Sequence, residues 1–426
     1  MIMVIKNGIV IDSGLKEQKM DIMVQNESII EVAPDIDEGG YPVVDASGCY
    51  VLPGFIDMNC EICDPGYENI EDLTTATRSA AKGGFTSITS QPTTKPVVDN
   101  KTVVNYIISR SAKLSMVNVF VYGSMTTDCA GSSMAEIGEM VNAGIVAISD
   151  GGKCVSDAAL MRNIMRYSSM FDIPVITACN DESLSAGGVV NAGRVASAYG
   201  LKGIPRDAEE IMVARNIVFS ENTGCKLHIS SVSTKGSVYL IRQAKARGVH
   251  ITCETQPHYF TLSEDMVEGY NTLAKVLPPL RTKEDIEAII EGLIDGTIDV
   301  ISSGHTPKTI ESKNREFDSA SFGISSLETA FSVSYDALVS TGKITIGNLI
   351  NKMSTMPAKI LNLENKSTIS DGSDADLVIF SADADYHINP ASFASKAKFS
   401  PYGGKTIKGQ VKYTIVGGEM VYIADL

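Results

Sequence analysis

Short apolar runs rich in β-branched residues alternate with longer segments of helical period from residue 50 to about residue 342. This alternation is typical of βα units, in which each strand is followed by a helix that covers the sheet. Helical segments such as 207–224 and 282–296 open on Asp or Thr and close on Gly, as helix caps prefer. The pattern predicts eight strands, which begin at Tyr50, Gly84, Val117, Gly144, Ile173, Lys226, His250 and Thr297.

Eight βα units within roughly 250 to 300 residues predict a closed (β/α)8 TIM barrel rather than an open, doubly wound sheet. No G-x-G-x-x-G segment follows the first expected strand, which argues against a dinucleotide-binding fold. The chain has 426 residues, more than one domain usually holds, so a smaller companion is expected. Residues 1–51 and 364–426 read as strand and turn, and we expect them to form one small β-sandwich domain beside a barrel of residues 52–363.

Composition excludes some classes of partner. The formal net charge of −15 argues against a nucleic acid, because nucleic-acid binding depends on clustered Lys and Arg. No apolar run approaches the roughly 20 residues of a membrane span, and the amino terminus lacks a secretory pattern, so we expect a cytoplasmic protein without a membrane partner. The eight cysteines are scattered, and we expect them to be reduced and packed as small apolar groups.

The active site of such a barrel lies at the carboxyl ends of its strands. A hydrolytic zinc site needs histidines, carboxylates and an open position for water. Alternation along the first expected strand points Asn59 and Glu61 into the barrel mouth together. The later strand ends supply few further ligands, namely Asp150 and Gly151, Ala178, Ser230 and Ser231, and Gly304 and His305.

Three segments carry a family resemblance: "PGFIDMNCEICDPGYENIEDLTTATRSAAKGGFTSI" from Pro53, "LHISSVSTKGSVYLIRQAKARG" from Leu227 and "GSDADLVIF" from Gly372. They resemble segments of the type I dihydroorotases of the amidohydrolase superfamily, and the similarity extends over essentially the whole chain. The resemblance implies a barrel that hydrolyses a cyclic amide with zinc, and a β domain built from both ends of the chain.

The resemblance also places the family's metal ligands on residues that do not suit zinc. Its His-x-His falls on Asn59 and Glu61, and its Asp-Asp-Gly falls on Asp150-Gly151-Gly152. Two further histidines and an aspartate that also shuttles protons fall on Ala178, Ser231 and Gly304, while His305 is retained. Too few ligands remain for a tetrahedral set, so we expect no zinc and no other cofactor.

The family's substrate contacts are replaced as well. The arginine that clamps the substrate carboxylate falls on Cys63, and the family's other contacts fall on Thr93, Leu277 and Lys308. A thiol in place of a bidentate guanidinium leaves no anion clamp at that position.

Three remodelled sites are alternatives to a vacated mouth. Oxygen atoms of Asp57, Glu61 and Asp150, with Asn59 and Asn180, would suit Mg²⁺ or Ca²⁺, although hydrogen-bonded polar groups filling the mouth explain them more simply. Cys60 and Cys63 with Cys154 or Cys179 would suit a soft metal, but residues three apart on a strand face opposite sides. His258 and His305 stand at strand ends as general bases, where a structural, hydrogen-bonded histidine is the commoner case.

The favoured hypothesis is a dihydroorotase-like protein of pyrimidine biosynthesis that lacks catalysis. Such family members act as structural partners of aspartate transcarbamoylase, and we expect a homodimer. One alternative is an active cyclic amidohydrolase, of the dihydroorotase, hydantoinase or allantoinase type, with a rebuilt site that uses Glu61, Asp150 and His305. Another is a ligand or metal sensor in the vacated barrel.

Overall fold

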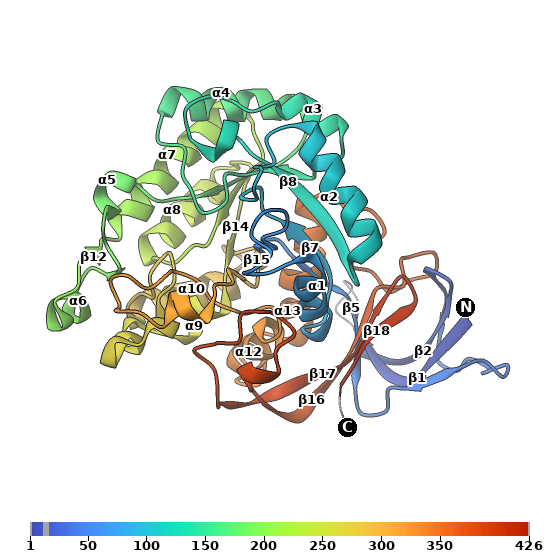
Figure 1. Cartoon of the computed structure of the whole chain (residues 1–426). Helices are drawn as coiled ribbons and strands as arrows, with labels where there is room; N and C mark the ends of the chain where they lie inside the picture. The colour runs from blue at the N-terminus through green and yellow to red at the C-terminus, as the bar shows by residue number, and fades with distance from the viewer. Residues whose placement is uncertain (1, 12–16, 425–426) are drawn as a thin grey trace.

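The computed structural model describes residues 2–11 and 17–424. Residues 1, 12–16 and 425–426, which belong to the expected β domain, lie outside the described residues. The chain forms a barrel surrounded by helices, with a separate sheet on one side that contains the first and last described strands (Figure 1). Within the described ranges, no helix has the length and apolar character needed to cross a membrane.

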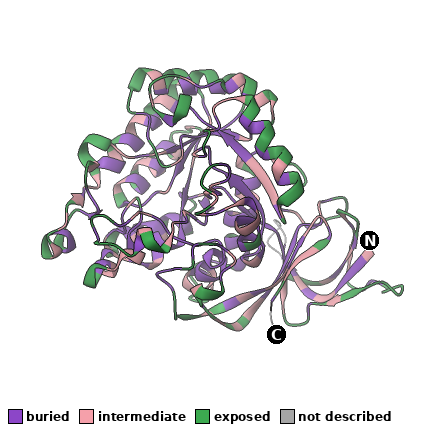
Figure 2. Ribbon diagram, in the orientation of Figure 1, coloured by how far each residue is buried: buried purple, intermediate pink, exposed green. Residues whose placement is uncertain are grey.

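The eight expected barrel strands are confirmed, and they follow one another around the sheet in chain order. The backbones of Cys60 and His305 form a parallel bridge that joins the first strand to the last and closes the barrel. The strands are buried on both faces, as a barrel sheet covered by helices requires (Figure 2). They are β6 (Phe55–Asp57), β7 (Phe85–Ser90), β8 (Asn118–Gly123), β9 (Ala147–Ile148), β10 (Val175–Ala178), β13 (Leu227–Ser230), β14 (Ile251–Thr255) and β15 (Val300–Ile301).

The covering helices begin and end where their caps predict. Asp157 accepts a hydrogen bond from the backbone N–H of Leu160 at the start of α4, and α7 and α10 end at Gly224 and Gly296, whose φ angles are 70° and 83°. The longer helices are α1 (Leu73–Lys82), α2 (Lys101–Leu114), α4 (Ala158–Ser168), α7 (Asp207–Thr223), α8 (Lys235–Ala246) and α10 (Lys283–Asp295).

Shorter elements fill the connections between these units. The short α-helices are α3 (Ile137–Asn142), α5 (Glu182–Ser185), α6 (Arg194–Tyr199), α9 (Pro257–Thr261), α11 (Ile310–Lys313), α12 (Ala330–Ser334), α13 (Ile346–Ile350) and α14 (Met356–Ile360). Short segments of 3-10 or π type are η1 (Thr127–Cys129), η2 (Ser169–Phe171), η3 (Glu264–Tyr270), η4 (Thr272–Ala274), η5 (Tyr335–Val339), η6 (Asn351–Thr355) and η7 (Pro390–Ser392). A two-stranded sheet pairs β11 (Val190–Asn191) with β12 (Gly203–Ile204).

The second sheet combines both ends of the chain in the order β18-β17-β16-β5-β1-β2-β3, with β4 paired to β1. Its strands are β1 (Ile2–Ile11), β2 (Glu17–Gln25), β3 (Ser28–Ala33), β4 (Val43–Asp45), β5 (Tyr50–Pro53), β16 (Leu377–His387), β17 (Thr406–Val416) and β18 (Glu419–Ile423). It has an apolar core of its own, in which Ile22 from the first part of the chain packs with Leu377 and Ile415 from the last.

The first expected strand, residues 50–58, is in fact two strands. Its first half, β5, pairs with β16 in the second sheet, and its second half, β6, pairs with β7 in the barrel. The break falls at Gly54, where a Cβ atom would lie 2.0 Å from the Thr86 hydroxyl oxygen. A glycine is required there because the chain passes this close to β7 as it enters the barrel.

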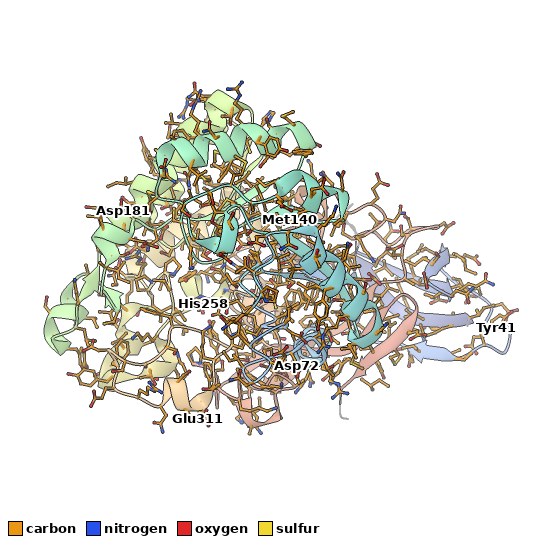
Figure 3. The ribbon with its side chains drawn as sticks, turned by 45° about the horizontal axis from the view of Figure 1, so that its top comes forward. Tyr41, Asp72, Met140, Asp181, His258 and Glu311 are labelled. Carbon is orange, nitrogen blue, oxygen red and sulfur yellow. The ribbon has the colours of Figure 1, made fainter. Side chains whose placement is uncertain are left out.

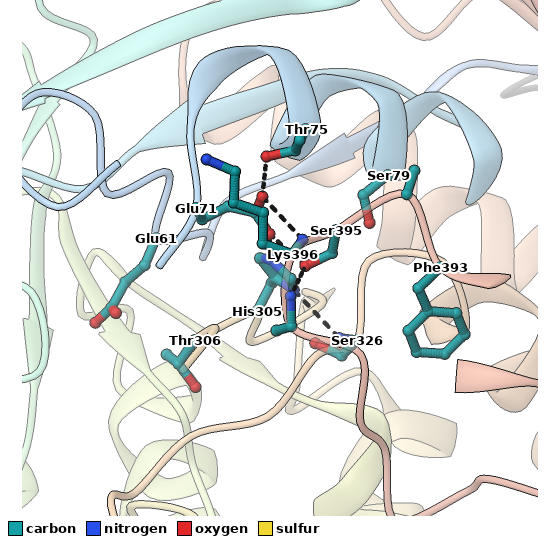
Figure 4. Close-up of polar contacts among 12 residues, drawn as sticks. Glu61, Glu71, Thr75, Ser79, His305, Thr306, Ser326, Phe393, Ser395 and Lys396 are labelled. Atoms are coloured by element: carbon teal, nitrogen blue, oxygen red, sulfur yellow. Dashed lines mark hydrogen bonds and ion pairs between the residues drawn. The ribbon is translucent and has the colours of Figure 1, made fainter. Parts of the chain in front are cut away.

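Two buried carboxylates fasten the segment around residue 395 to the barrel. Glu71, just before α1, accepts hydrogen bonds from the Thr75 and Ser395 hydroxyls and from the Lys396 backbone N–H at 3.3 Å (Figure 4). Burial disfavours its charge, but these bonds and the neighbouring His305 lower the pKa of Glu71 below its ordinary value.

Glu328 is the second of these carboxylates. Its Oε1 accepts hydrogen bonds from the Ala394 N–H at 2.6 Å and the Ser79 hydroxyl at 3.1 Å, and its Oε2 lies 2.8 Å from Lys82 Nζ. The carboxylate therefore joins α1 to the segment between β16 and β17.

We predict that Glu328→Gln lowers the free energy of unfolding by about 1.5 to 3 kcal/mol, because buried hydrogen bonds to a charged group are lost. Glu221→Gln is the matched control, since Glu221 is 45% exposed and lies 3.5 Å from Arg247. Its effect should stay below about 0.5 kcal/mol. Chemical denaturation of both variants measures the difference, and equal effects would contradict the assigned role of Glu328.

Candidate functional site

A cavity of about 180 Å³ lies at the carboxyl ends of the barrel strands. Eleven of the residues singled out in the sequence line it, namely Asn59, Glu61, Gly151, Gly152, Ala178, Cys179, Asn180, Ser230, Ser231, Leu277 and Lys308. A second cavity of about 230 Å³ contains Cys63 and Thr93 and shares Glu61, Gln91 and Lys308 with the first. Gly304 lines a smaller pocket beside Asn59 and Ser231. The mouth thus collects most of the expected positions.

Amide and hydroxyl groups connect two of the expected metal positions. Asn59 Nδ2 donates to Glu254 Oε1 at 2.7 Å and to Ser231 Oγ at 3.3 Å. Gln256 Nε2 donates to Ser231 Oγ at 3.1 Å and to Ser302 Oγ at 3.0 Å. These bonds give the Asn59 amide N–H and the Ser231 hydroxyl protein partners, whereas Glu254 Oε2 and Gln256 Oε1 have no hydrogen-bond partner within the described residues.

Asp57 and Asp150, two of the candidate oxygen ligands, are buried and already bonded. Asp57 accepts hydrogen bonds from the Ser303 hydroxyl and from its N–H at 2.7 Å, and burial raises the pKa of Asp57 to about 7. Asp150 accepts from the backbone N–H groups of Met125 at 2.8 Å and Thr126 at 3.0 Å, and burial raises its pKa as well. Neither carboxylate lines the main cavity.

Glu61, the third candidate, forms an ion pair across the mouth. Its Oε2 lies 3.1 Å from Lys308 Nζ, and the side chains of Glu61 and Lys308 are 25% and 24% exposed. An expected metal position therefore pairs with an expected substrate position.

Neighbouring side chains lie close to Gly151 and Gly304, the two positions at which the resemblance places aspartates. Gly151 and Gly304 both have a φ of +64°, a conformation that favours glycine. A Cβ atom would lie 2.6 Å from Thr93 Cγ2 at Gly151 and 2.5 Å from Gln256 Cγ at Gly304. Any residue other than glycine at position 151 or 304 would have to displace these neighbouring side chains.

The two candidate histidines do not line the main cavity. His258 lies among the side chains in the middle of the barrel, and burial lowers its pKa to about 3 (Figure 3). His305 is also fully buried, its Nδ1 accepts from the Ser326 N–H at 3.2 Å, and its Nε2 faces Glu71 Oε2 at 3.5 Å (Figure 4). His258 instead lines the small pocket that contains Gly304, whereas His305 lies beside Glu71 and Ser326.

All eight cysteines are free thiols. Burial raises the pKa of Cys63 to about 12 and that of Cys60 well above its ordinary value. It raises the pKa of Cys154 and Cys179 in the same way. Metals and electrophiles react with the thiolate, so these cysteines are poor ligands and nucleophiles.

The residues at the mouth do not fit a zinc ion. Within residues 2–11 and 17–424, no three His, Cys, Asp or Glu side chains form a group that could hold a metal. Two acids line the main cavity within the described part of the chain. Glu61 faces an ammonium, and Glu209 accepts from the Ser233 and Thr234 N–H groups at 3.0 and 3.2 Å. Zinc needs several such donors around one point.

Sequence reasoning missed Gln91, Glu254 and Gln256, which complete the polar network. Each lies at or near the carboxyl end of an expected strand, and this position in the sequence could have identified it as a candidate site residue. Their contacts reach Asn59 from residues far apart in the chain, so the network itself had no sequence pattern.

Comparison with known proteins adds independent information. A family model described as dihydro-orotase-like matches residues 48–237. Curated relatives named dihydroorotase include one from Ruminiclostridium cellulolyticum, 48% identical over 98% of both chains, and one from Caldanaerobacter subterraneus subsp. tengcongensis, 47% identical over 98% of this chain and 97% of the relative.

Solved structures agree on the fold. The L-hydantoinase (dihydropyrimidinase) from Arthrobacter aurescens has a TM-score of 0.89 and 25% identity, covering 98% of this chain and 95% of that one. The dihydropyrimidinase from Brevibacillus agri has a TM-score of 0.85 and 23% identity, covering 99% and 95%. These likenesses confirm the expected amidohydrolase barrel with its accompanying sheet.

We predict that Gly304→Ala lowers the free energy of unfolding more than Gly224→Ala does. Both glycines have a positive φ, which costs a non-glycine residue roughly 1 to 2 kcal/mol, but only Gly304 has a neighbour within reach of a Cβ atom. The contact with Gln256 should add about 1 to 3 kcal/mol. Urea denaturation compares the two variants, and equal losses would show that Gln256 moves aside freely.

The pKa of Asp57 predicts a pH dependence of stability. Its folded pKa, about 7, lies above the ordinary 3.8, so its contribution is full below the ordinary value and is lost as the pH rises through 7. The free energy of unfolding relative to Asp57→Asn should therefore fall by up to about 1.4 kcal/mol per pH unit in this window. Denaturation of both proteins at several pH values measures this difference, and a constant difference would exclude the raised pKa.

Proposed function

The chain belongs to the dihydroorotase family, and on that premise we propose that it serves pyrimidine biosynthesis without performing zinc-dependent ring hydrolysis. The donor set at the mouth carries this proposal, because an amide, a methyl and a hydroxyl group, those of Asn59, Ala178 and Ser231, stand where the resemblance places metal-binding histidines. The scaffold meanwhile keeps its strand order and closure.

Hydrolysis of a cyclic amide needs an activated water and donors for the oxygen that gains charge. Of the residues proposed for a rebuilt site, Asp150 and His305 are buried and bonded to their own surroundings. Of the three, Glu61 alone faces the cavity, where Lys308 Nζ lies 3.1 Å from its Oε2. Of the three residues of the rebuilt site, one carboxylate therefore faces the cavity, and neither of the other two stands beside it as a second acid or base.

We further propose a structural role as a homodimer that associates with aspartate transcarbamoylase. Family analogy supports this partner, together with a barrel and sheet that are complete although the mouth is altered. A chain that has a complete fold but lacks the metal ligands is suited to a role in which its surface binds other proteins.

A second candidate is an active cyclic amidohydrolase. The names of the relatives favour it, because proteins 47% and 48% identical over nearly the whole chain are named dihydroorotase, and the compared structures are hydantoinases. The two candidates differ in one measurable property, turnover.

We predict no hydrolysis of dihydroorotate, hydantoin or allantoin above the buffer rate, with or without added Zn²⁺, because no metal-activated water is available. The Ruminiclostridium cellulolyticum relative, prepared in the same way, is the positive control. Turnover by this chain that rises with Zn²⁺ would establish the second candidate.

The partner role predicts that the chain co-purifies with aspartate transcarbamoylase from its native cell extract. Size-exclusion chromatography with mass spectrometry identifies the complex. Recovery of the chain alone, with transcarbamoylase assembly unchanged in its absence, would contradict the role.

A further inference from the structure

We propose that the mouth cavity binds a small zwitterion of the α-amino acid class, which enters between Glu61 and Lys308. This inference deepens the proposed function and rests on it, since it assigns a ligand to a mouth that holds no zinc. The ligand's ammonium group pairs with Glu61, and its carboxylate pairs with Lys308.

The Glu61–Lys308 ion pair stands between two cavities. Both residues line the cavity of about 180 Å³ and also the one of about 230 Å³. About a quarter of each side chain is exposed, so a solute reaches the pair without unfolding of the barrel.

A chain of amide contacts orients Gln91, which lines the same two cavities as Glu61. Asn59 turns its Nδ2 toward Glu254 Oε1 at 2.7 Å and presents Oδ1 on its other side. Gln91 Nε2 donates to that oxygen at 3.5 Å. This orientation leaves Gln91 Oε1 as an acceptor, which within the described part of the chain has no hydrogen-bond partner.

Gln91 is 7% exposed and lines both cavities, like the ion pair. A buried acceptor without a donor is costly. Gln91 Oε1 itself has almost no accessible surface, so the acceptor that a ligand's N–H donors reach is the Glu61 carboxylate, and an ammonium supplies several such donors.

Lys308 is the cation in this cavity that is available to a ligand's carboxylate. Arg281 also lines the cavity, but its guanidinium donates to Asn191 Oδ1 at 2.9 Å, Ile204 O at 3.0 Å and Ser233 Oγ at 3.1 Å. Lys308 donates to Glu61 at 3.1 Å.

Charge balance selects a zwitterion over a simple ion. A bare carboxylate that bound Lys308 would leave Glu61 without its counter-charge, and a bare amine would do the same to Lys308. Leaving one partner of a desolvated pair uncompensated is strongly unfavourable. A zwitterion exchanges one ion pair for two and leaves the cavity neutral.

Isothermal titration calorimetry tests the inference with glycine, L-alanine and L-aspartate as probes, up to about 10 mM. Propionate, ethylamine and hydantoin are the comparison ligands, since each lacks one charge or both. We expect at least one of the three amino acids to bind, and the comparison ligands to bind at least about tenfold more weakly.

Three variants test the residues. Glu61→Gln and Lys308→Met should each weaken the binding by at least about tenfold, whereas the surface control Glu221→Gln should not change it. The double variant E61K/K308E restores the ion pair in the opposite sense and should recover binding relative to either single charge reversal, which also shows that the mouth remains folded.

Absence of binding by all three amino acids, or equal affinity in Glu61→Gln and the unaltered chain, would overturn the inference. Tighter binding of propionate, ethylamine or hydantoin would overturn it too, in favour of that ligand's chemistry. These outcomes are independent of turnover, so zinc-dependent hydrolysis would refute the proposed function and missing amino-acid binding would refute only this inference.

Discussion

The seam where the first barrel strand meets the last is the constraint on which the rest of the structure depends. The backbones of Cys60 and His305 form a parallel β-bridge, and the Glu61 N–H donates to the His305 carbonyl at 2.8 Å. Beside them, buried Asp57 accepts a hydrogen bond from the Ser303 N–H. Because the seam must close to make a barrel, its residues keep their places whatever chemistry the mouth performs. Asn59 and Glu61 on one side of it and Lys308 on the other are therefore presented to the same cavity.

The carboxylates around this seam have partners within the protein. One oxygen of Glu254 accepts a hydrogen bond from Asn59, Glu61 pairs with Lys308, and Asp150 accepts from backbone N–H groups. Side chains of Thr93 and Gln256 occupy the space beside the two glycines. The mouth behaves as one repacked unit, in which restoring a single ligand would create a clash or an unpaired charge.

The sequence was most informative where one physical rule acts locally. The eight barrel strands and the helix ends at Gly224 and Gly296 follow from apolar runs and capping. The division of the strand at Gly54 was missed, because it depends on Thr86 in a neighbouring strand. The network of Asn59, Gln91 and Glu254 was missed for the same reason, since its members lie up to 195 residues apart. Tertiary contacts of this kind leave no periodic trace.

The central claim is that a dihydroorotase-type barrel can keep its fold while its mouth no longer has a ligand set for zinc. Metal analysis by inductively coupled plasma mass spectrometry tests it most directly, on protein expressed with added zinc and purified without chelators, beside the Ruminiclostridium cellulolyticum relative as reference. The account predicts far less than one zinc per chain, with the protein folded. Zinc at about one or two ions per chain would contradict it.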